Sequence, residues 1–173
     1  RHKSLQYLVL IIMSVFLFVG GPHTYSSRSF VNFWNLGHIL LFALFFTIIL
    51  KDLKWIKEKN FFIQFIVILS STIFIGFVIE FIQSDFNRTA DFGDIWRNIV
   101  GALVAVFFSE KTTRLKKGLK YLFVCLVIIL VIIELEPLFT SLFDEHLARK
   151  KFPVLADFET PFELNRWETD CQF

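Results

Sequence analysis

The chain has 173 residues, of which 55% are hydrophobic, and 24 of them are phenylalanine. A soluble protein of this length cannot bury that much apolar surface in one core, so the composition excludes an ordinary soluble domain. Part of the apolar surface must face the lipid of a bilayer. The net charge is only +2, so the information lies in how the charges are distributed along the chain.

The cysteines and the basic segments exclude further classes. Cys125 lies inside an apolar run and Cys171 lies near the end of the sequence, a spacing that does not indicate a disulfide framework. The sequence has no metal-type cysteine spacing and no glycine-rich phosphate loop, and we predict no metal and no cofactor. The basic residues lie between apolar runs, where lysines orient a membrane protein, so no nucleic-acid partner is expected.

Apolar runs in chain order predict an all-α integral membrane protein with a five-helix transmembrane bundle. The first run resembles a signal peptide, but no small-x-small cleavage pattern follows it, which favours a retained span. The second is short for a membrane unless residues 31–36 contribute, and the third is long enough to cross alone. The runs are residues 5–19, 37–50, 61–83, 94–108 and 119–133.

The sequence changes character after the fifth run. We therefore predict a transmembrane domain over residues 1–137 and a short extracytoplasmic tail over residues 138–173. The string ADFETPFELNRWE, residues 156–168, resembles the opening strand of a β-sandwich of the carbohydrate-binding kind, and it implies a longer parent protein. An ordinary tail on the lipid headgroups is the alternative for a single strand-like signal.

The distribution of basic residues predicts the orientation. They cluster before the first run, between the second and third, and between the fourth and fifth, whereas the other two connections hold Arg28 and Arg88. The positive-inside rule places the N-terminus in the cytoplasm, and five spans place the C-terminus outside. Residues 149–151 are all basic and would lie outside in this topology, which does not follow the rule. They lie well past the last span, where the rule weakens.

A dense polar stretch, residues 80–101, lies between the third and fourth runs, and ionisable groups in that position mark sites. Asp94 and Asn98 are four residues apart and Glu80 and Gln83 are three apart, so each pair shares a helix face. Asp91 either continues the face of Asp94 or caps the helix N-terminus.

Helix geometry sets the depths of these groups. With a rise of about 1.5 Å per residue, Glu80 lies roughly 30 Å along the third span, and His38 and Asn98 lie about 20 and 18 Å from the inner edge. Three spans therefore bring polar groups into the outer half of the membrane and predict a polar pocket there. Gly76 and Gly101 lack side chains that would keep these helices apart.

The same stretch resembles the VanZ-like family of bacterial membrane proteins. An E-x-x-Q pair and an R-x-x-D-x-x-D-x-x-x-N-x-x-G string carry the resemblance at Glu80, Gln83, Arg88, Asp91, Asp94, Asn98 and Gly101. His38 opens the second span as in the family, although residues 35–37 replace the acidic or lysine residues often found before it. The match covers roughly residues 5–133, and its specific part is residues 80–101.

The resemblance implies a multi-pass protein of the bacterial cytoplasmic membrane with a role at the cell envelope. The family takes its name from resistance to the glycopeptide antibiotic teicoplanin. A biochemical mechanism is not part of what the resemblance implies.

Three hypotheses fit the polar stretch, and the leading one is binding of an anionic, lipid-linked envelope molecule such as a cell-wall precursor or glycolipid. Arginines hold phosphate or carboxylate through paired hydrogen bonds, a role open to Arg88 and Arg97. The excess of acids over cations counts against this hypothesis. The predicted ligand-binding residues are His38, Glu80, Gln83, Arg88, Asp91, Asp94 and Asn98.

The second hypothesis is an intramembrane enzyme in which carboxylates and His38 bind a divalent metal or act as acid and base, although no recognised enzyme signature is present. The third is structural: the arginines neutralise the acids, Asn98 and Gln83 join the third and fourth spans, and the bundle anchors the C-terminal part.

Overall fold

The computed structural model describes residues 2–19, 22, 25–84 and 91–152, and this part of the chain is helical throughout, without strands. Among the helices of these described residues, three are long and apolar enough to cross a membrane: α2, α4 and α7. The helices are α1 (His2–Val19), α2 (Arg28–Asp52), α3 (Lys54–Lys57), α4 (Phe61–Ser84), α5 (Phe92–Phe107), α6 (Glu110–Thr113) and α7 (Lys117–Lys151).

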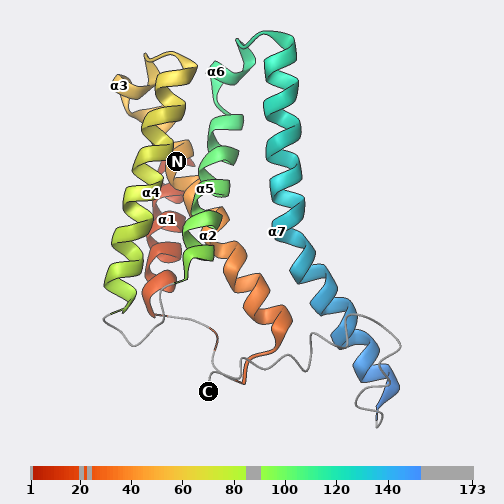
Figure 1. Cartoon of the computed structure of the whole chain (residues 1–173). Helices are drawn as coiled ribbons and strands as arrows, with labels where there is room; N and C mark the ends of the chain where they lie inside the picture. Colours follow the sequence, from red (N-terminus) through yellow and green to blue (C-terminus); the bar gives the residue numbers. More distant parts are fainter. Residues whose placement is uncertain (1, 20–21, 23–24, 85–90, 153–173) are drawn as a thin grey trace.

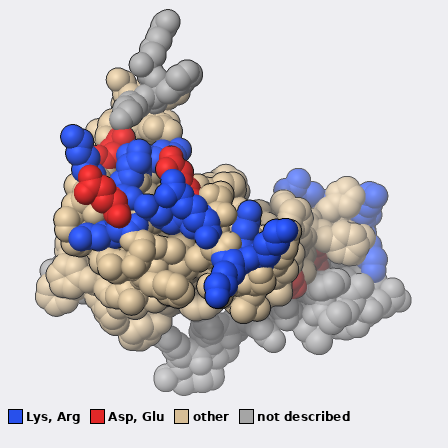
Figure 2. Space-filling view, turned by 90° about the horizontal axis from the view of Figure 1, so that it is seen from above, with Lys and Arg blue, Asp and Glu red and all other residues tan. Residues whose placement is uncertain are grey.

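The long helices run in alternating directions, and the short helices α3 and α6 lie in the connections at one end (Figure 1). We call this the lysine end, because Lys and Arg side chains gather over it in the view onto that end (Figure 2). The opposite end, which holds the first turn of α2 and the last turns of α7, is the far end. The bundle therefore places both lysine-rich connections on one side, as the predicted topology requires.

Polar side chains fix where the helices begin. The Ser27 hydroxyl accepts a hydrogen bond from the Phe30 N–H at the start of α2, and the Asn60 side chain accepts one from the Ile63 N–H before α4. The Asp91 carboxylate accepts one from the Gly93 N–H, so Asp91 is the N-cap of α5. Each contact satisfies a backbone donor that the first turn leaves open.

The core lies where α2 packs against α5. A Cβ on Gly101 would overlap the Ile39 carbonyl oxygen and lie 3.0 Å from the Phe42 Cβ, so only glycine allows this approach. A Cβ on Gly76 would be 3.4 Å from the Asn98 Nδ2 across the interface of α4 with α5. Gly101 of α5 thus lets α2 come close to α5, and Gly76 of α4 lets α4 do so.

The prediction of an all-α chain with membrane-length apolar helices is confirmed for the described residues. The second run forms a longer helix than its apolar part, because α2 includes residues 31–36 and reaches 25 residues. The first and fourth runs form α1 and α5, of 18 and 16 residues. Five crossings of a membrane therefore remain a prediction.

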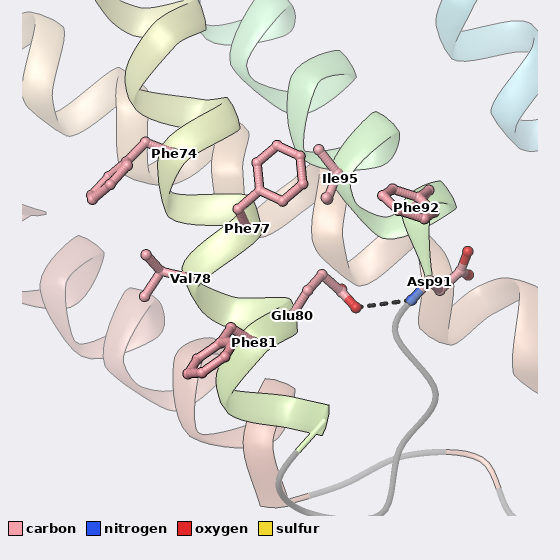
Figure 3. Close-up of a pocket in the computed structure, with 8 residues that line it drawn as sticks. All are labelled: Phe74, Phe77, Val78, Glu80, Phe81, Asp91, Phe92 and Ile95. Atoms are coloured by element: carbon pink, nitrogen blue, oxygen red, sulfur yellow. Dashed lines mark hydrogen bonds between the residues drawn. The ribbon is translucent and has the colours of Figure 1, made fainter.

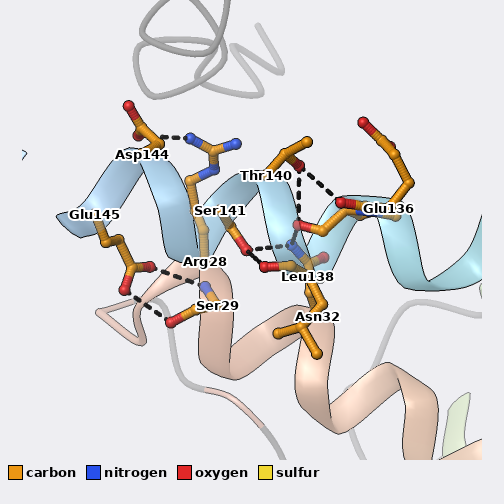
Figure 4. Close-up of polar contacts among 10 residues, drawn as sticks. Arg28, Ser29, Asn32, Glu136, Leu138, Thr140, Ser141, Asp144 and Glu145 are labelled. Carbon is orange, nitrogen blue, oxygen red and sulfur yellow. Dashed lines mark hydrogen bonds and ion pairs between the residues drawn. The ribbon is translucent and has the colours of Figure 1, made fainter. Parts of the chain in front are cut away.

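The limit predicted at residue 137 does not coincide with a helix end. α7 continues without interruption to Lys151, with Pro137 inside it. The Pro137 carbonyl and the Ser141 hydroxyl both accept from the Asn32 side chain of α2, at 2.8 and 3.1 Å (Figure 4). The polar side chains of Ser141, Asp144 and Glu145 therefore contact α2 from within α7 and do not mark the end of the helix; residues 156–168 lie outside the described residues.

Charged contacts extend this joint between α2 and α7. The Arg28 guanidinium lies 3.3 Å from the buried Asp144 carboxylate, and the Glu145 carboxylate accepts from the Ser29 backbone N–H and hydroxyl at 2.9 and 2.8 Å (Figure 4). Glu145 therefore satisfies an open N–H at the start of α2, where a negative charge also suits the helix dipole.

We expect Gly101→Ala to destabilise the fold, because the added methyl group must push α2 away from α5. Overpacking of this kind costs about 1–3 kcal/mol, which should appear as a lower thermal unfolding midpoint of the detergent-solubilised protein. Gly118→Ala is the matched control, since a Cβ there meets nothing within 4 Å. Equal midpoints for the two variants would contradict the close approach.

Candidate functional site

His38 on α2 lies between two polar side chains of α5. Its Nδ1 is 3.1 Å from the Asn98 Oδ1, and its Nε2 is 3.3 Å from the Asp94 Oδ2. All three side chains are buried, with exposed fractions of 3% for His38, 6% for Asp94 and 0% for Asn98. Sequence spacing placed Asp94 and Asn98 on one face and His38 at a similar depth, and the structure brings the three into contact.

Two proton arrangements suit this contact. An imidazolium donates from both ring nitrogens to Asn98 and Asp94, whereas a neutral ring donates to Asp94 and accepts from the Asn98 amide after that amide turns over. As oriented here, the buried Asn98 Nδ2 has no hydrogen-bond partner among the described residues, and it faces Gly76. Either way, Asp94 accepts from His38, which holds the imidazole ring in place.

Arg97 joins Asp94 to two further carboxylates. Its Nη1 donates to the Asp94 Oδ1 at 2.7 Å and lies 3.5 Å from the Asp91 Oδ2. Its Nε lies 3.4 Å from the Glu134 Oε2 of α7. One guanidinium thus connects the first turns of α5 with the middle of α7. A guanidinium carries five N–H donors in one plane, so it can bond to several carboxylates at once.

Glu80 connects α4 to the same region. Its Oε2 accepts from the Asp91 backbone N–H at 2.9 Å, and the residue is 6% exposed. We call the set joined by these contacts the polar cluster: His38, Glu80, Asp91, Asp94, Arg97, Asn98 and Glu134.

The structure brings together five of the seven predicted site residues, namely His38, Glu80, Asp91, Asp94 and Asn98. Asp91 caps α5, the second of the two roles that its position allowed. Asn98 bonds to α2, whereas the structural hypothesis expected it to tie the third span to the fourth. Arg88 and the side chain of Gln83 lie outside the described residues.

Sequence reasoning missed Glu134. The residue directly follows the most apolar run, inside the predicted transmembrane domain of residues 1–137, and it is not among the predicted site residues. A carboxylate that directly follows the thirteen apolar positions 121–133 is itself the signal, because an acid at membrane depth requires a partner. Arg97 was considered as a cation for the acids but not placed in the site, and the structure makes it the residue with the most ionic contacts in the polar cluster.

An apolar groove of about 470 Å³ opens beside the polar cluster between α4 and α5 (Figure 3). Phe74, Phe77 and Phe81 of α4 line one side, and Phe92 and Ile95 of α5 line the other. Glu80 and Asp91 form its polar end, where the Asp91 backbone N–H donates to the Glu80 carboxylate (Figure 3). The groove therefore combines largely apolar, aromatic walls with a small polar end, at which Asp91 is the exposed carboxylate and Glu80 is buried.

His38 borders a second cavity, of about 330 Å³, between α1, α2 and α7. Met13, Phe16, Trp34 and Leu138 are among the side chains of its largely apolar wall.

The carboxylates are dispersed along the polar cluster. In the part of the chain that the structure describes, no three His, Cys, Asp or Glu side chains are grouped so that they could hold a metal ion. What the arrangement can do is accept hydrogen bonds at Glu80 and Asp91 and hold three helices together through Arg97 and His38.

Comparisons with protein-family models, with curated proteins and with solved structures find no match to this chain. The VanZ-like resemblance read from residues 80–101 therefore stays a prediction.

We expect Arg97→Gln to lower the free energy of unfolding in detergent by roughly 3–5 kcal/mol, because it leaves Asp94 and Glu134 without their shared cation. Combined with Glu134→Gln in a double-mutant cycle, it should give a coupling energy of about 0.5–3 kcal/mol. Lys116→Gln, which removes an exposed cation, is the control. An Arg97→Gln variant as stable as that control would rule out a structural role for the ion pairs.

Proposed function

We propose that this chain is a VanZ-like protein of the bacterial cytoplasmic membrane that binds an anionic, lipid-linked molecule of the cell envelope. The observation that carries the proposal is the groove between α4 and α5, with aromatic walls and a polar end. An amphiphile has the same division, and ligand sites usually combine apolar walls with a few placed polar groups. The apolar chain lies along Phe74, Phe77 and Phe81, and the headgroup lies beside Glu80 and Asp91.

The charges of the polar end define what the headgroup must offer. The Asp91 side chain is 58% exposed and its carboxylate accepts hydrogen bonds, so the part of the headgroup beside it carries sugar hydroxyl or ammonium groups. Arg97 is engaged by three carboxylates and does not serve the ligand. The phosphate is therefore assigned to Arg88, the cation in the segment that joins α4 to α5.

A second candidate function is structural, and the Arg97 contacts favour it. They join α5 to α7, the helix that leads to the C-terminal part of the chain, while His38 joins α5 to α2. In this proposal the polar cluster locks a membrane anchor for an extracytoplasmic segment, and the groove holds only bulk lipid.

Both functions rest on the proposed topology of five crossings, with the N-terminus in the cytoplasm and the C-terminus outside. The lengths of α2, α4 and α7 and the gathering of basic residues at the lysine end support it. α1 and α5 are shorter, but α5 packs between α2, α4 and α7 and is largely screened from lipid.

Cysteine labelling tests the topology in a background with Cys125→Ser and Cys171→Ser. Tyr25→Cys and His146→Cys at the far end should react with a membrane-impermeant maleimide in intact cells. Lys57→Cys and Lys116→Cys at the lysine end should react only after permeabilisation, because the positive-inside rule places them in the cytoplasm. Labelling of both ends from the same side would contradict the five crossings.

A photoreactive polyprenyl phosphate tests the binding proposal in the purified protein. Val78→Trp fills the groove and Arg88→Gln removes the proposed phosphate ligand, and each should reduce crosslinking roughly tenfold or more, since hydrogen bonds to charged groups are the strong ones. Val15→Trp on α1 and Arg114→Gln at the lysine end are matched controls, because both positions are exposed and lie outside the groove.

The two candidate functions give different outcomes. Crosslinking that all four variants leave unchanged, together with a strong loss of stability in Arg97→Gln, would favour the structural function. Crosslinking lost in Val78→Trp and Arg88→Gln with unchanged thermal unfolding would favour ligand binding.

A further inference from the structure

A third, smaller hollow lies at the lysine end, remote from the polar cluster. It has a volume of about 60 Å³ and lies where α2, α3, α4, the end of α5 and α6 meet. Lys51 comes from α2, Lys57 from α3 and Lys111 from α6, and Glu110 is the one carboxylate among the residues that line it. The lining thus has a net positive charge contributed by three different helices.

Gln64 of α4 is the buried polar residue of this hollow. Its exposed fraction is 2%, and its Nε2 donates to the Ile56 carbonyl oxygen at 2.9 Å. That bond fixes the amide, because turning it over would set two carbonyl oxygens against each other. The Oε1 is buried and has no hydrogen-bond partner among the described residues. An unpaired buried acceptor is costly and calls for a donor.

The two observations together define the ligand. Three lysines suit the phosphate of an anionic group, whereas the Gln64 carbonyl needs a hydrogen-bond donor. A phosphodiester group alone has no proton to donate to the carbonyl, and an ammonium group is repelled by the lysines. A phosphate ester with a hydroxyl group a few bonds away satisfies both.

The surroundings identify the carrier of this group as a lipid. The hollow has room for headgroup atoms only, and Phe108 beside it is 71% exposed and available to an acyl chain. The site lies at the basic end of membrane-length helices, where anionic lipids concentrate near lysines.

We propose that the hollow at the lysine end binds the headgroup of an anionic glycerophospholipid, with Lys51, Lys57 and Lys111 on its phosphate and Gln64 accepting from a headgroup hydroxyl. The proposal rests on the membrane location proposed above and is independent of the groove between α4 and α5. It differs from general attraction between lysines and anionic lipids in requiring particular lysines and a neutral buried amide.

Native mass spectrometry of the detergent-solubilised full chain tests it with three probes. These are phosphatidylglycerol, phosphatidylmethanol, which has the same charge but no headgroup hydroxyl, and inorganic phosphate as competitor. The combined variant Lys51→Gln, Lys57→Gln and Lys111→Gln should bind phosphatidylglycerol roughly tenfold or more weakly, since each surface lysine contributes appreciably to anionic lipid binding. The control combines Lys54→Gln, Lys116→Gln and Lys117→Gln, all exposed and outside the hollow, and should bind nearly as the native protein does.

Gln64→Met tests the buried amide. The native protein should prefer phosphatidylglycerol to phosphatidylmethanol, and the variant should bind the two equally while keeping its thermal unfolding midpoint within the range of the lysine variants. The ratio of the two affinities remains informative even if the lost bond to Ile56 lowers stability. Val78→Trp in the groove should leave both affinities unchanged, which separates this site from the proposed function.

Three outcomes would overturn the proposal. A control triple variant that loses as much affinity as the combined variant would show diffuse attraction to lysines. Equal binding of the two lipids by the native protein would remove the role of Gln64. Displacement of lipid by inorganic phosphate at comparable concentration would make the hollow a site for soluble phosphate.

Discussion

The contact of α2 with α5 is the constraint on which the other contacts of the bundle depend. Without a side chain at Gly101, the backbone of α5 reaches the backbone of α2 at Ile39, next to His38. This closeness sets His38 within reach of Asp94 and Asn98, and the polar contacts in turn prevent α2 from rotating or sliding along α5. Apolar packing alone tolerates such slippage, because lipid and neighbouring helices offer similar apolar surroundings.

Ionic and hydrogen-bond contacts also join the start of α5 to α4 and α7. Asp94 accepts from both His38 and Arg97, so a single carboxylate couples the α2 contact to the ion pair with Glu134 on α7. Acidic residues predominate in the polar cluster, and each is held by a donor: the Asp91 backbone N–H for Glu80, and Arg97 for the others. Side chains so engaged have a structural role whatever ligand the groove takes.

Periodicity and depth were enough to predict the helices and the meeting of His38, Asp94 and Asn98, because a helix has a fixed rise and a fixed angle per residue. They did not predict the partners of Arg97, since the rotation of α7 relative to α5 is set by packing that no local pattern records. Polar residues beyond Glu134 looked like a soluble segment for a similar reason. Their partners, Arg28, Ser29 and Asn32, lie more than a hundred positions earlier in the chain.

The uninterrupted course of α7 sets a distance for whatever follows it. A helix of 35 residues is about 52 Å long, whereas the hydrocarbon core is about 30 Å thick. Contacts with Arg28 and Ser29 hold its last turns against the start of α2. In the proposed topology, these turns lie far from the bilayer centre. The end of α7 at Lys151 then lies beyond the outer headgroups, at a height that helix length fixes and that a flexible tether would leave variable.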